Sequence, residues 1–482
     1  MTPQQILTRH DAAIGRRRPH EAQWRDAYAH VLPAPHEAAS LYDATAADAA
    51  EQLAASLLAE LTPPWSRWFG LAPARALADT EEGQAAAAAL ETTAETLQAH
   101  LDRSNFAVEM HQAFLDLVIT GTGIMLVEEA PPGETTALRF SAIPVRSAIL
   151  EEGVNGRLDT VFREARMTTA EMLRRFPFAE IPAAMQREAA AEADAPDPIR
   201  HRLIEAVWPD GAGHRYAAVF DAEGLKAPIL VAQGRFADAP FIAFRWLKAP
   251  GETYGRGPVI KALPDIRTAN RVVELVLKNA SIAVTGIWQA EDDGVLNPAT
   301  VQLIPGAIIP KAPGSAGLTP LAAPGNFDVS QLVLNDLRAR IRTALLADRL
   351  SIARDQRMTA TEVLERSAET ARLLGATYGR LQTELLTPLI ARSLAILARR
   401  GEVPPVLLDQ GRVALRYESP LARVQGRADA ANTLLFLDAV AKMGEAAAAQ
   451  VDAPAAARWL ARTLGAPAEI LTPVPSPLVQ PE

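Results

Sequence analysis

The sequence contains no cysteine among its 482 residues. This absence excludes disulfide bonds, zinc sites built on thiolates and cysteine nucleophiles, and it fits a protein made in a reducing compartment. The eight histidines are scattered, and no pair of them has metal-ligand spacing such as H-E-x-x-H. We therefore expect no bound metal, and we place the protein in the cytoplasm or in something assembled there.

An excess of basic residues is also lacking, since the net charge is -9 and the isoelectric point is near 5.6. A protein that captures nucleic acid on a large surface needs many clustered Lys and Arg side chains, so any contact with DNA must be local or weak. The N-terminus carries charges where a signal peptide needs an apolar core, and no apolar run reaches the roughly 18 residues of a membrane span. We expect no membrane association.

The composition is that of a globular protein, with 49% hydrophobic and 22% charged residues. The apolar spacing predicts helices over 3–31, from Asp43 or Thr45 to the prolines at 63 and 64, over 82–103 and from residue 106 onward. Alternating segments between 124 and 250 predict strands, so residues up to 250 read as one α+β body. Trp65, Trp68 and Phe69 are expected to anchor a loop on the core or on a neighbouring subunit.

Two glycines, Gly121 and Gly123, lie where a predicted helix passes into a predicted strand. A phosphate-binding loop has the opposite order, strand then helix, because it uses the positive N-terminus of the helix. The pair therefore predicts a turn and not a nucleotide site.

The next hundred residues follow a different plan. Two helices of similar length are predicted, over 264–286 with Pro264 at its start and over 328–350 with Asp328 three positions before Gln331. The strand-like insert between them, 287–327, carries six prolines from Pro298 to Pro324. Equal helices around such an insert suggest an antiparallel pair with a small extended domain at its far end.

A longer helix is predicted after this pair. Thr359 and Glu362 form a T-x-x-E capping box, and a C-terminal signal at Gly401 follows about 40 residues later. Pro388 lies inside this helix, so we expect a kink there because one backbone hydrogen bond is lost. A strand from Val413, two further helices and a proline-rich tail complete the chain.

Four blocks in this order resemble the portal, or head-to-tail connector, proteins of tailed bacteriophages. They are "YDATAADAAEQLAASLLAELTPPWSRWF", "DLVITGTGIMLVEE", "ETYGRGPVIKALPDIRTAN" and "MTATEVLER". The similarity extends over nearly the whole chain. It implies a portal fold of the α+β class, mainly helical, in a closed ring of about twelve subunits at one capsid vertex of the virion. Double-stranded DNA would be packaged and ejected through this ring.

The resemblance also implies a division of the chain and a set of partners. It assigns 1–263 to a wing, 264–286 and 328–350 to stem helices, 287–327 to a clip, 351–420 to a tunnel loop with the long kinked helix and the return to the wing, and 421–482 to a crown and tail. The partners would be the terminase packaging motor, head-tail adaptor or tail proteins, and the major capsid and scaffolding proteins. ATP hydrolysis would belong to the motor, so we expect neither enzymatic activity nor a cofactor.

Two candidate sites follow. The segment Tyr254, Gly255, Arg256, Gly257 and Pro258 lacks G-x-G-x-x-G and is interpreted as a rigid turn, a wing–stem hinge that sets the angle of the stem. The alternative is an ordinary turn, and neither interpretation includes a ligand. We expect the two glycines to adopt backbone angles that a β-carbon disfavours.

The second candidate site is a DNA tunnel loop with Arg349, Arg354 and Arg357, which alternate with Asp348 and Asp355. In a ring, each arginine would become a circle of positive charge that holds DNA transiently, while the carboxylates prevent tight binding. The alternative is that these residues form ion pairs between subunits.

Two other functions remain open from the sequence, a ring-forming head-tail adaptor or scaffold and a helical α+β enzyme. An enzyme would need a catalytic constellation, and the sequence contains no G-x-S-x-G, H-E-x-x-H or Walker-type phosphate loop.

Overall fold

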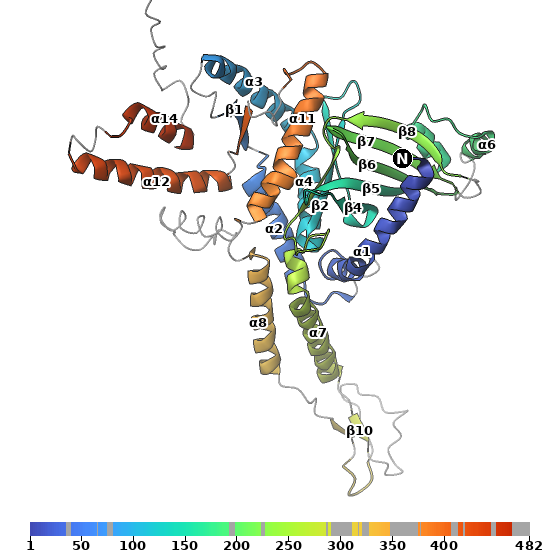
Figure 1. Cartoon of the computed structure of the whole chain (residues 1–482). Coiled ribbons are helices and arrows are strands. Elements are labelled where there is room, and N and C mark those ends of the chain that lie inside the picture. Colours follow the sequence, from blue (N-terminus) through green and yellow to red (C-terminus); the bar gives the residue numbers. More distant parts are fainter. Residues whose placement is uncertain are drawn as a thin grey trace, which may run out of the picture.

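The structure is a computed structural model of the whole chain. It describes residues 1–34, 40–64, 66–74, 81–191, 198–222, 227–285, 288–290, 311–316, 318–320, 327–347, 375, 377–405, 413–417, 420–444 and 450–464. Helices and sheets are mixed, with helix the larger share, as the sequence predicts. Figure 1 shows an α+β body from which one pair of helices projects.

Four helices account for most of the first 120 residues, and their positions confirm the apolar spacing. They are α1 (Pro3–Val31), α2 (Thr45–Leu61), α3 (Glu81–Arg103) and α4 (Phe106–Thr120). Thr2 and Gln5 form a capping box at the start of α1, and the Asp43 carboxylate accepts a hydrogen bond from the Thr45 amide at the start of α2.

Two antiparallel sheets form the body. The three-stranded sheet has the order β3-β2-β9, built from β2 (Thr122–Glu129), β3 (Leu138–Ala142) and β9 (Phe241–Arg245). The five-stranded sheet is a meander of β4 (Ala148–Glu152), β5 (Leu158–Met167), β6 (His201–Asp210), β7 (Gly213–Asp221) and β8 (Ile229–Phe236). Three short helices accompany them: η2 (Val145–Ser147), α5 (Thr169–Arg175) and α6 (Ala183–Ala191).

The main core lies between α2, α4 and the three-stranded sheet, where the predicted apolar stripe of α4 is buried: Phe106, Met110, Phe114 and Leu117. A second core fills the space between α1 and the five-stranded sheet, with Ile6 against Phe162 and Ile204. Trp68 and Phe69 are buried in the main core, which confirms the core interpretation for these two rings, whereas Trp65 lies outside the described residues. Phe69 opens β1 (Phe69–Pro73), which pairs with β12 (Val413–Tyr417).

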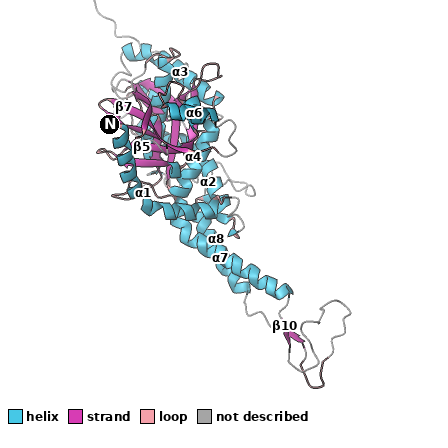
Figure 2. Cartoon of the chain, turned by 90° about the vertical axis from the view of Figure 1, so that its right-hand side faces the viewer, coloured by secondary structure: helices cyan, strands magenta, loops and turns pink. Residues whose placement is uncertain are grey.

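The projecting pair consists of α7 (Pro258–Thr285) and α8 (Phe327–Ala344), which lie side by side in both views (Figures 1 and 2). At their far end, β10 (Trp288–Ala290) pairs antiparallel with β11 (Leu318–Pro320). The base of the pair is tied to the body because Asp43 accepts a hydrogen bond from Arg338 of α8 at 2.8 Å, and Asn270 of α7 accepts one from the Asp43 amide at 3.1 Å.

The predicted start of the first long helix is wrong. We expected Pro264 at its first turn, but α7 begins six residues earlier at Pro258, and Pro264 lies inside it. Val259, Leu263 and Ile266 on both sides of Pro264 are buried in the main core. This packing outweighs the local cost of a proline inside a helix. From the sequence alone, a proline at this position is read as a helix start.

The predicted end of the second long helix is also wrong, and so is the prediction that the two helices of the pair have equal lengths. Helix α8 ends at Ala344 and not at Leu350, and it has 18 residues against 28 in α7. The backbone turns at Leu346, whose φ of 57° lies in the left-handed region. Leu345 and Ala347 on either side of Leu346 are buried. We attribute the early end of the helix to these core contacts, since the sequence pattern continues to Leu350. Asp328 lies inside α8, which begins at Phe327.

The predicted helix from Thr359 is described only from residue 375 onward, so its capping box lies outside the described residues. We expected a kink at Pro388. The described helix has a π-helical turn, η4 (Gln382–Leu386), and continues directly as α11 (Thr387–Arg399) with Pro388 in its first turn. The helix Thr377–Arg399 is long and apolar enough to cross a membrane, but Leu385, Leu389 and Leu394 lie in the main core. We interpret it as a core helix.

The C-terminal part contains α12 (Pro420–Lys442) and α14 (Ala453–Leu464). They lie together on the side of the body away from the five-stranded sheet (Figure 1). The proline-rich tail from Leu471 lies outside the described residues.

Candidate functional site at the start of the helix pair

The turn between α4 and β2 forms one side of the site. Gly121 ends α4 with a φ of 88°, and its amide donates to the Leu117 carbonyl at 2.9 Å. A left-handed residue at this position is a common helix end, and glycine adopts it without strain. The prediction of a turn at Gly121 is therefore confirmed, while Gly123 lies within β2 opposite Phe244.

The segment from Tyr254 to Pro258 crosses this turn at backbone contact. A β-carbon on Gly255 would lie 2.0 Å from the Gly121 carbonyl oxygen, and one on Gly257 would lie 2.5 Å from the Val118 carbonyl oxygen. Reciprocally, a β-carbon on Gly121 would lie 2.3 Å from the Gly257 nitrogen. The Gly255 amide also donates to the Thr122 hydroxyl at 2.9 Å. Two stretches of backbone thus touch with no side chain between them.

The reason expected for the two glycines is therefore wrong. Neither Gly255 nor Gly257 has a φ in the left-handed region. Glycine is needed because the chains approach too closely for a β-carbon, a tertiary cause that the sequence around residue 255 does not carry.

Tyr254 fixes the segment to the N-terminal helix and to the five-stranded sheet. Its side chain is buried, and its hydroxyl accepts a hydrogen bond from the Leu150 amide at 3.0 Å. Its ring stands edge-on to Trp24, with ring centroids 5.0 Å apart, and close to His20. Burial raises the pKa of Tyr254 to about 12, so the hydroxyl stays protonated.

Arg256 and Pro258 have simpler roles. The Arg256 guanidinium is exposed and pairs with Glu252 four residues earlier, a hydrogen bond that lowers the pKa of the Glu252 carboxyl. The Arg256 amide donates to the Leu247 carbonyl at 2.8 Å. Pro258 is the first residue of α7, where its missing amide costs no helical hydrogen bond.

Arg245, at the end of β9, lies directly beneath this segment and is fully buried. Its guanidinium donates to the Thr253 carbonyl at 3.2 Å and to the Gly156 carbonyl at 2.8 Å, and it pairs with Glu152. A β-carbon on Gly255 would lie 3.1 Å from the Arg245 β-carbon. Arg245 therefore touches the chain just before α7.

A second carboxylate that pairs with Arg245 lies 139 residues later in the sequence. Glu384 accepts hydrogen bonds from the Arg245 amide at 2.9 Å, from Nε at 3.3 Å and from Nη2 at 2.7 Å. Glu384 lies in the π turn η4, so this pair joins the turn to the start of the helix pair.

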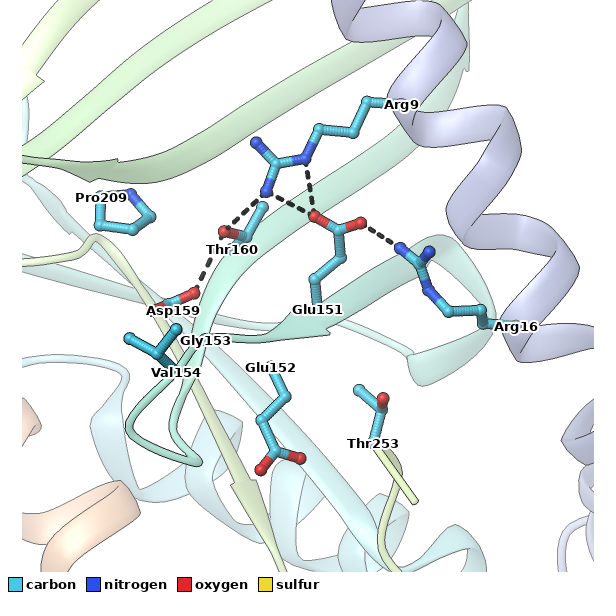
Figure 3. Close-up of a pocket in the computed structure, with 10 residues that line it drawn as sticks. All are labelled: Arg9, Arg16, Glu151, Glu152, Gly153, Val154, Asp159, Thr160, Pro209 and Thr253. Carbon is cyan, nitrogen blue, oxygen red and sulfur yellow. Dashed lines mark hydrogen bonds and ion pairs between the residues drawn. The ribbon is translucent and has the colours of Figure 1, made fainter. Parts of the chain in front are cut away.

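An open hollow of about 530 Å³ lies beside the junction. Figure 3 shows Arg9 and Arg16 of α1 pointing toward Glu151, and both form ion pairs with it. Glu152 on the same rim pairs with Lys248 and Arg245. The residues that line the hollow include two arginines and three carboxylates, the third being Asp159, so the hollow has no cationic surplus with which to hold a phosphate.

The candidate tunnel residues Arg349, Arg354 and Arg357 lie outside the described residues, so the structure does not place them. Within the described residues, no group of three or more His, Asp or Glu side chains is arranged to hold a metal ion.

Residues 3–471 match the family described as "Bacteriophage head to tail connecting protein". The chain belongs to this family. Three relatives of this connector carry portal names. A "Probable portal protein" of Bordetella phage BPP-1 is 26% identical over 82% of this chain and 72% of its own length. The "Portal protein" of Salmonella phage epsilon15 is 23% identical over 90% and 80%, and that of Escherichia phage T7 is 20% identical over 63% and 55%.

Among solved structures, a chain of "Virion of native gene transfer agent (GTA) particle" is 13% identical to this connector chain. The alignment covers 86% of this chain and 88% of that chain, with a TM-score of 0.34.

The sequence located the turn of this connector but missed the residues that hold it. Arg245 and Glu384 were not singled out, and they are 139 positions apart. One signal could have found Arg245: it is the only charge in the apolar run "FIAFRW", and a charge that is buried with such a run needs a partner. No local feature identifies Glu384 as that partner.

Proposed function

We propose that this chain is the portal subunit of a tailed bacteriophage. In this proposal about twelve copies form a closed ring at one vertex of the capsid, and double-stranded DNA enters and leaves through its channel. The packaging motor, and then an adaptor or the tail, dock on the ring. The observation that carries the proposal is the family match over residues 3–471, which includes the body and the projecting helix pair.

The helix pair supports a ring because it leaves apolar side chains uncovered in the isolated chain. Leu275 and Leu277 on α7 are 46% and 53% exposed, and Leu332 and Val333 on α8 are 73% and 45% exposed. Helices that project from a body with such side chains in water are stabilised when a neighbour covers them. In a cyclic assembly the covered surfaces belong to successive subunits.

The electrostatics are consistent with a channel through which DNA slides. A net charge of -9 per subunit disfavours tight capture of DNA, which depends on many phosphate contacts. Local rings of Arg349, Arg354 and Arg357 would supply a weak and transient hold. The chemistry of translocation would reside in a separate motor, and this chain would not be an enzyme.

The same proposal divides the chain into wing, stem, clip and crown. We take the boundaries from the helices that the structure shows. The wing would comprise residues up to 257, and α7 and α8 would be the stem. The clip would lie between these helices, and α12 and α14 would belong to the crown. The segment Tyr254–Pro258 would set the angle between wing and stem as a fixed contact, because Gly121 and Gly255 meet through their backbones.

The proposal is tested by the mass and shape of the purified protein. About twelve copies of a 51.7 kDa chain give about 600 kDa, and electron micrographs should show rings with a central hole. Mass photometry that finds only monomers or dimers at micromolar concentration would contradict the ring. A ring of clearly different subunit number that binds to preformed portals would favour a head-tail adaptor instead.

A further inference from the structure

The π turn η4 interrupts an otherwise regular helix in the middle of the main core. Here the Thr387 amide donates to the Gln382 carbonyl, five residues back. Isolated π turns of this kind are uncommon and recur at functional positions. Pro388 follows directly and has no amide to donate, which removes one of the hydrogen bonds that would favour a regular α-helix.

The turn is held on one side by strand β12. The Tyr417 hydroxyl lies 2.6 Å from the Thr387 hydroxyl and donates to the Gln382 carbonyl at 3.3 Å. The Thr387 hydroxyl also donates to that carbonyl, at 2.9 Å. The carbonyl that defines the π register therefore accepts side-chain hydrogen bonds that a regular helix would not need.

Arg245 is the second group that holds the turn. Glu384, the third residue of η4, is bound both by the Arg245 backbone amide and by its guanidinium. Arg380, one helical turn earlier, adds a hydrogen bond to the same carboxylate at 3.2 Å. Arg245 in turn contacts the carbonyl of Thr253 just before α7.

Conversion of η4 to α-helix would change this arrangement by a fixed step. The turn holds one residue more than an α-helical turn, so moving this extra residue along the chain rotates the residues between its old and new positions by about 100° and shifts them by about 1.5 Å. Leu389, Ile390 and Leu394 after the turn are buried in the main core, and so are Tyr378 and Leu381 before it. A change of register would therefore have to repack Tyr378 and Leu381, and the Glu384 carboxylate would leave Arg245.

We propose that η4 is a two-position register switch, and that Arg245 is the positioning residue that couples its position to the start of α7. With Glu384 in place, Arg245 holds the Thr253 carbonyl and the segment before α7 is fixed against Gly121. When the register changes, Arg245 loses its main counter-charge and this segment loosens. The inference rests on the contacts of the fold, and only its consequence for DNA passage rests on the proposed function.

The competing explanation is that η4 only accommodates Pro388 and has no effect on α7. Hydrogen exchange measured by mass spectrometry on the full-length assembled protein separates the two. We expect Glu384→Gln to increase exchange about tenfold or more in peptides that cover 254–263, in addition to 377–387. The matched control is Glu129→Gln, which removes the ion pair of Arg399 at the other end of the same helix and should leave 254–263 unchanged.

Two further variants decide the outcome. Tyr417→Phe keeps the ring and removes only the hydroxyl, so it should loosen η4 and increase exchange at 254–263 even if Glu384→Gln does not fold. Pro388→Ala alone should leave 254–263 as in the native protein, because Arg245 and Tyr417 still hold the register. Faster exchange confined to 377–387 in Tyr417→Phe and Glu384→Gln would overturn the coupling. So would a Pro388→Ala variant that by itself reproduces the full change at 254–263.

Discussion

Gly255 and Gly121 are 134 positions apart, yet a β-carbon on Gly255 would lie 2.0 Å from the Gly121 carbonyl oxygen. The contact fixes where α7 leaves the body, because Gly121 caps the end of α4 and α7 begins three residues after Gly255. The obstacle to any larger side chain is backbone, which cannot move aside as a flexible side chain can. The junction therefore behaves as a rigid contact between two elements.

We expect Gly255→Ala to destabilise the protein by about 2–4 kcal/mol, because the added methyl group overlaps the backbone of Gly121 between α4 and β2. Gly255→Val with Gly257→Val should also disrupt the stem geometry and ring assembly. Thermal unfolding followed by circular dichroism measures the first effect, and mass photometry the second. Gly15→Ala is the matched control: no atom lies within 4 Å of its added β-carbon, and helix propensity predicts a gain of about 0.5–1 kcal/mol. A double valine variant that assembles and packages normally would show that the contact does not set the stem.

We expect the Arg245–Glu384 pair to behave as a buried charge pair. Arg245→Ala should cost about 3–5 kcal/mol of unfolding free energy, because it leaves the Glu384 carboxylate, 10% exposed, without its main partner. Arg245→Met combined with Glu384→Gln should recover a large part of the loss, since both charges of the pair are removed together. Arg380 then loses its partner but is 31% exposed, and Glu152 keeps Lys248. Chemical denaturation of the native protein, Arg245→Met, Glu384→Gln and the double variant gives the coupling. Strictly additive losses would mean that the two side chains do not act as a pair.

The buried pair of Asp116 and Tyr28 predicts a pH dependence. The Tyr28 hydroxyl donates to the Asp116 carboxylate at 2.5 Å, the Val145 amide donates to it at 3.2 Å, and Arg146 is the nearby cation. Burial raises the pKa of Asp116 to about 6 from an ordinary value of 3.8. A raised carboxyl pKa means that the folded state binds the proton more tightly than the unfolded state does. This contribution to stability is therefore present at low pH and is lost as pH rises from about 4 to about 6.

Asp116→Asn removes this titration. We expect the stability of the native protein minus that of the variant to fall by about 3 kcal/mol between pH 4 and pH 7, which is the effect of a shift of about two units. Denaturation midpoints measured at pH 4, 5, 6 and 7 test the sign and the window. A stability difference that is constant over this range would show that Asp116 titrates near its ordinary pKa in the folded protein.

The exposed leucines of the helix pair predict the interface of the proposed ring. Leu277→Glu with Leu332→Glu should leave the folded chain intact and prevent ring formation, because two buried carboxylates per contact would be desolvated without partners. Circular dichroism should be unchanged, and mass photometry should shift from about 600 kDa toward the monomer. Val154→Glu is the control, since Val154 is fully exposed at a hairpin tip far from the pair in sequence. Intact rings in the double variant would place the interface elsewhere.

Local sequence signals were sufficient to predict most of the helices and strands. The helix ends that were predicted wrongly have a common cause. Apolar spacing located α1 and α4, because this signal lies within the helices that it defines. Pro264 and Leu346 were misjudged because packing against the main core extends α7 before the proline and stops α8 early. The glycines at 255 and 257 indicated the junction before α7. The residues that contact it could not be predicted, since Gly121 and Glu384 are distant from it in sequence.

The last prediction concerns Arg354 and Arg357, which lie between the predicted end of the second long helix and the capping box at Thr359. If these arginines line the channel of the proposed ring, each position presents about twelve positive charges to the DNA backbone. Nearby Asp348 and Asp355 keep the net charge small, so the hold should be weak and sensitive to salt. Arg354→Ala with Arg357→Ala should then leave rings intact and alter the retention or packaging of DNA. Packaged DNA protected from nuclease, measured over increasing salt, gives the readout. Loss of ring assembly would instead favour ion pairs between subunits. Rings that package and retain DNA like the native protein would exclude a contact role for both arginines.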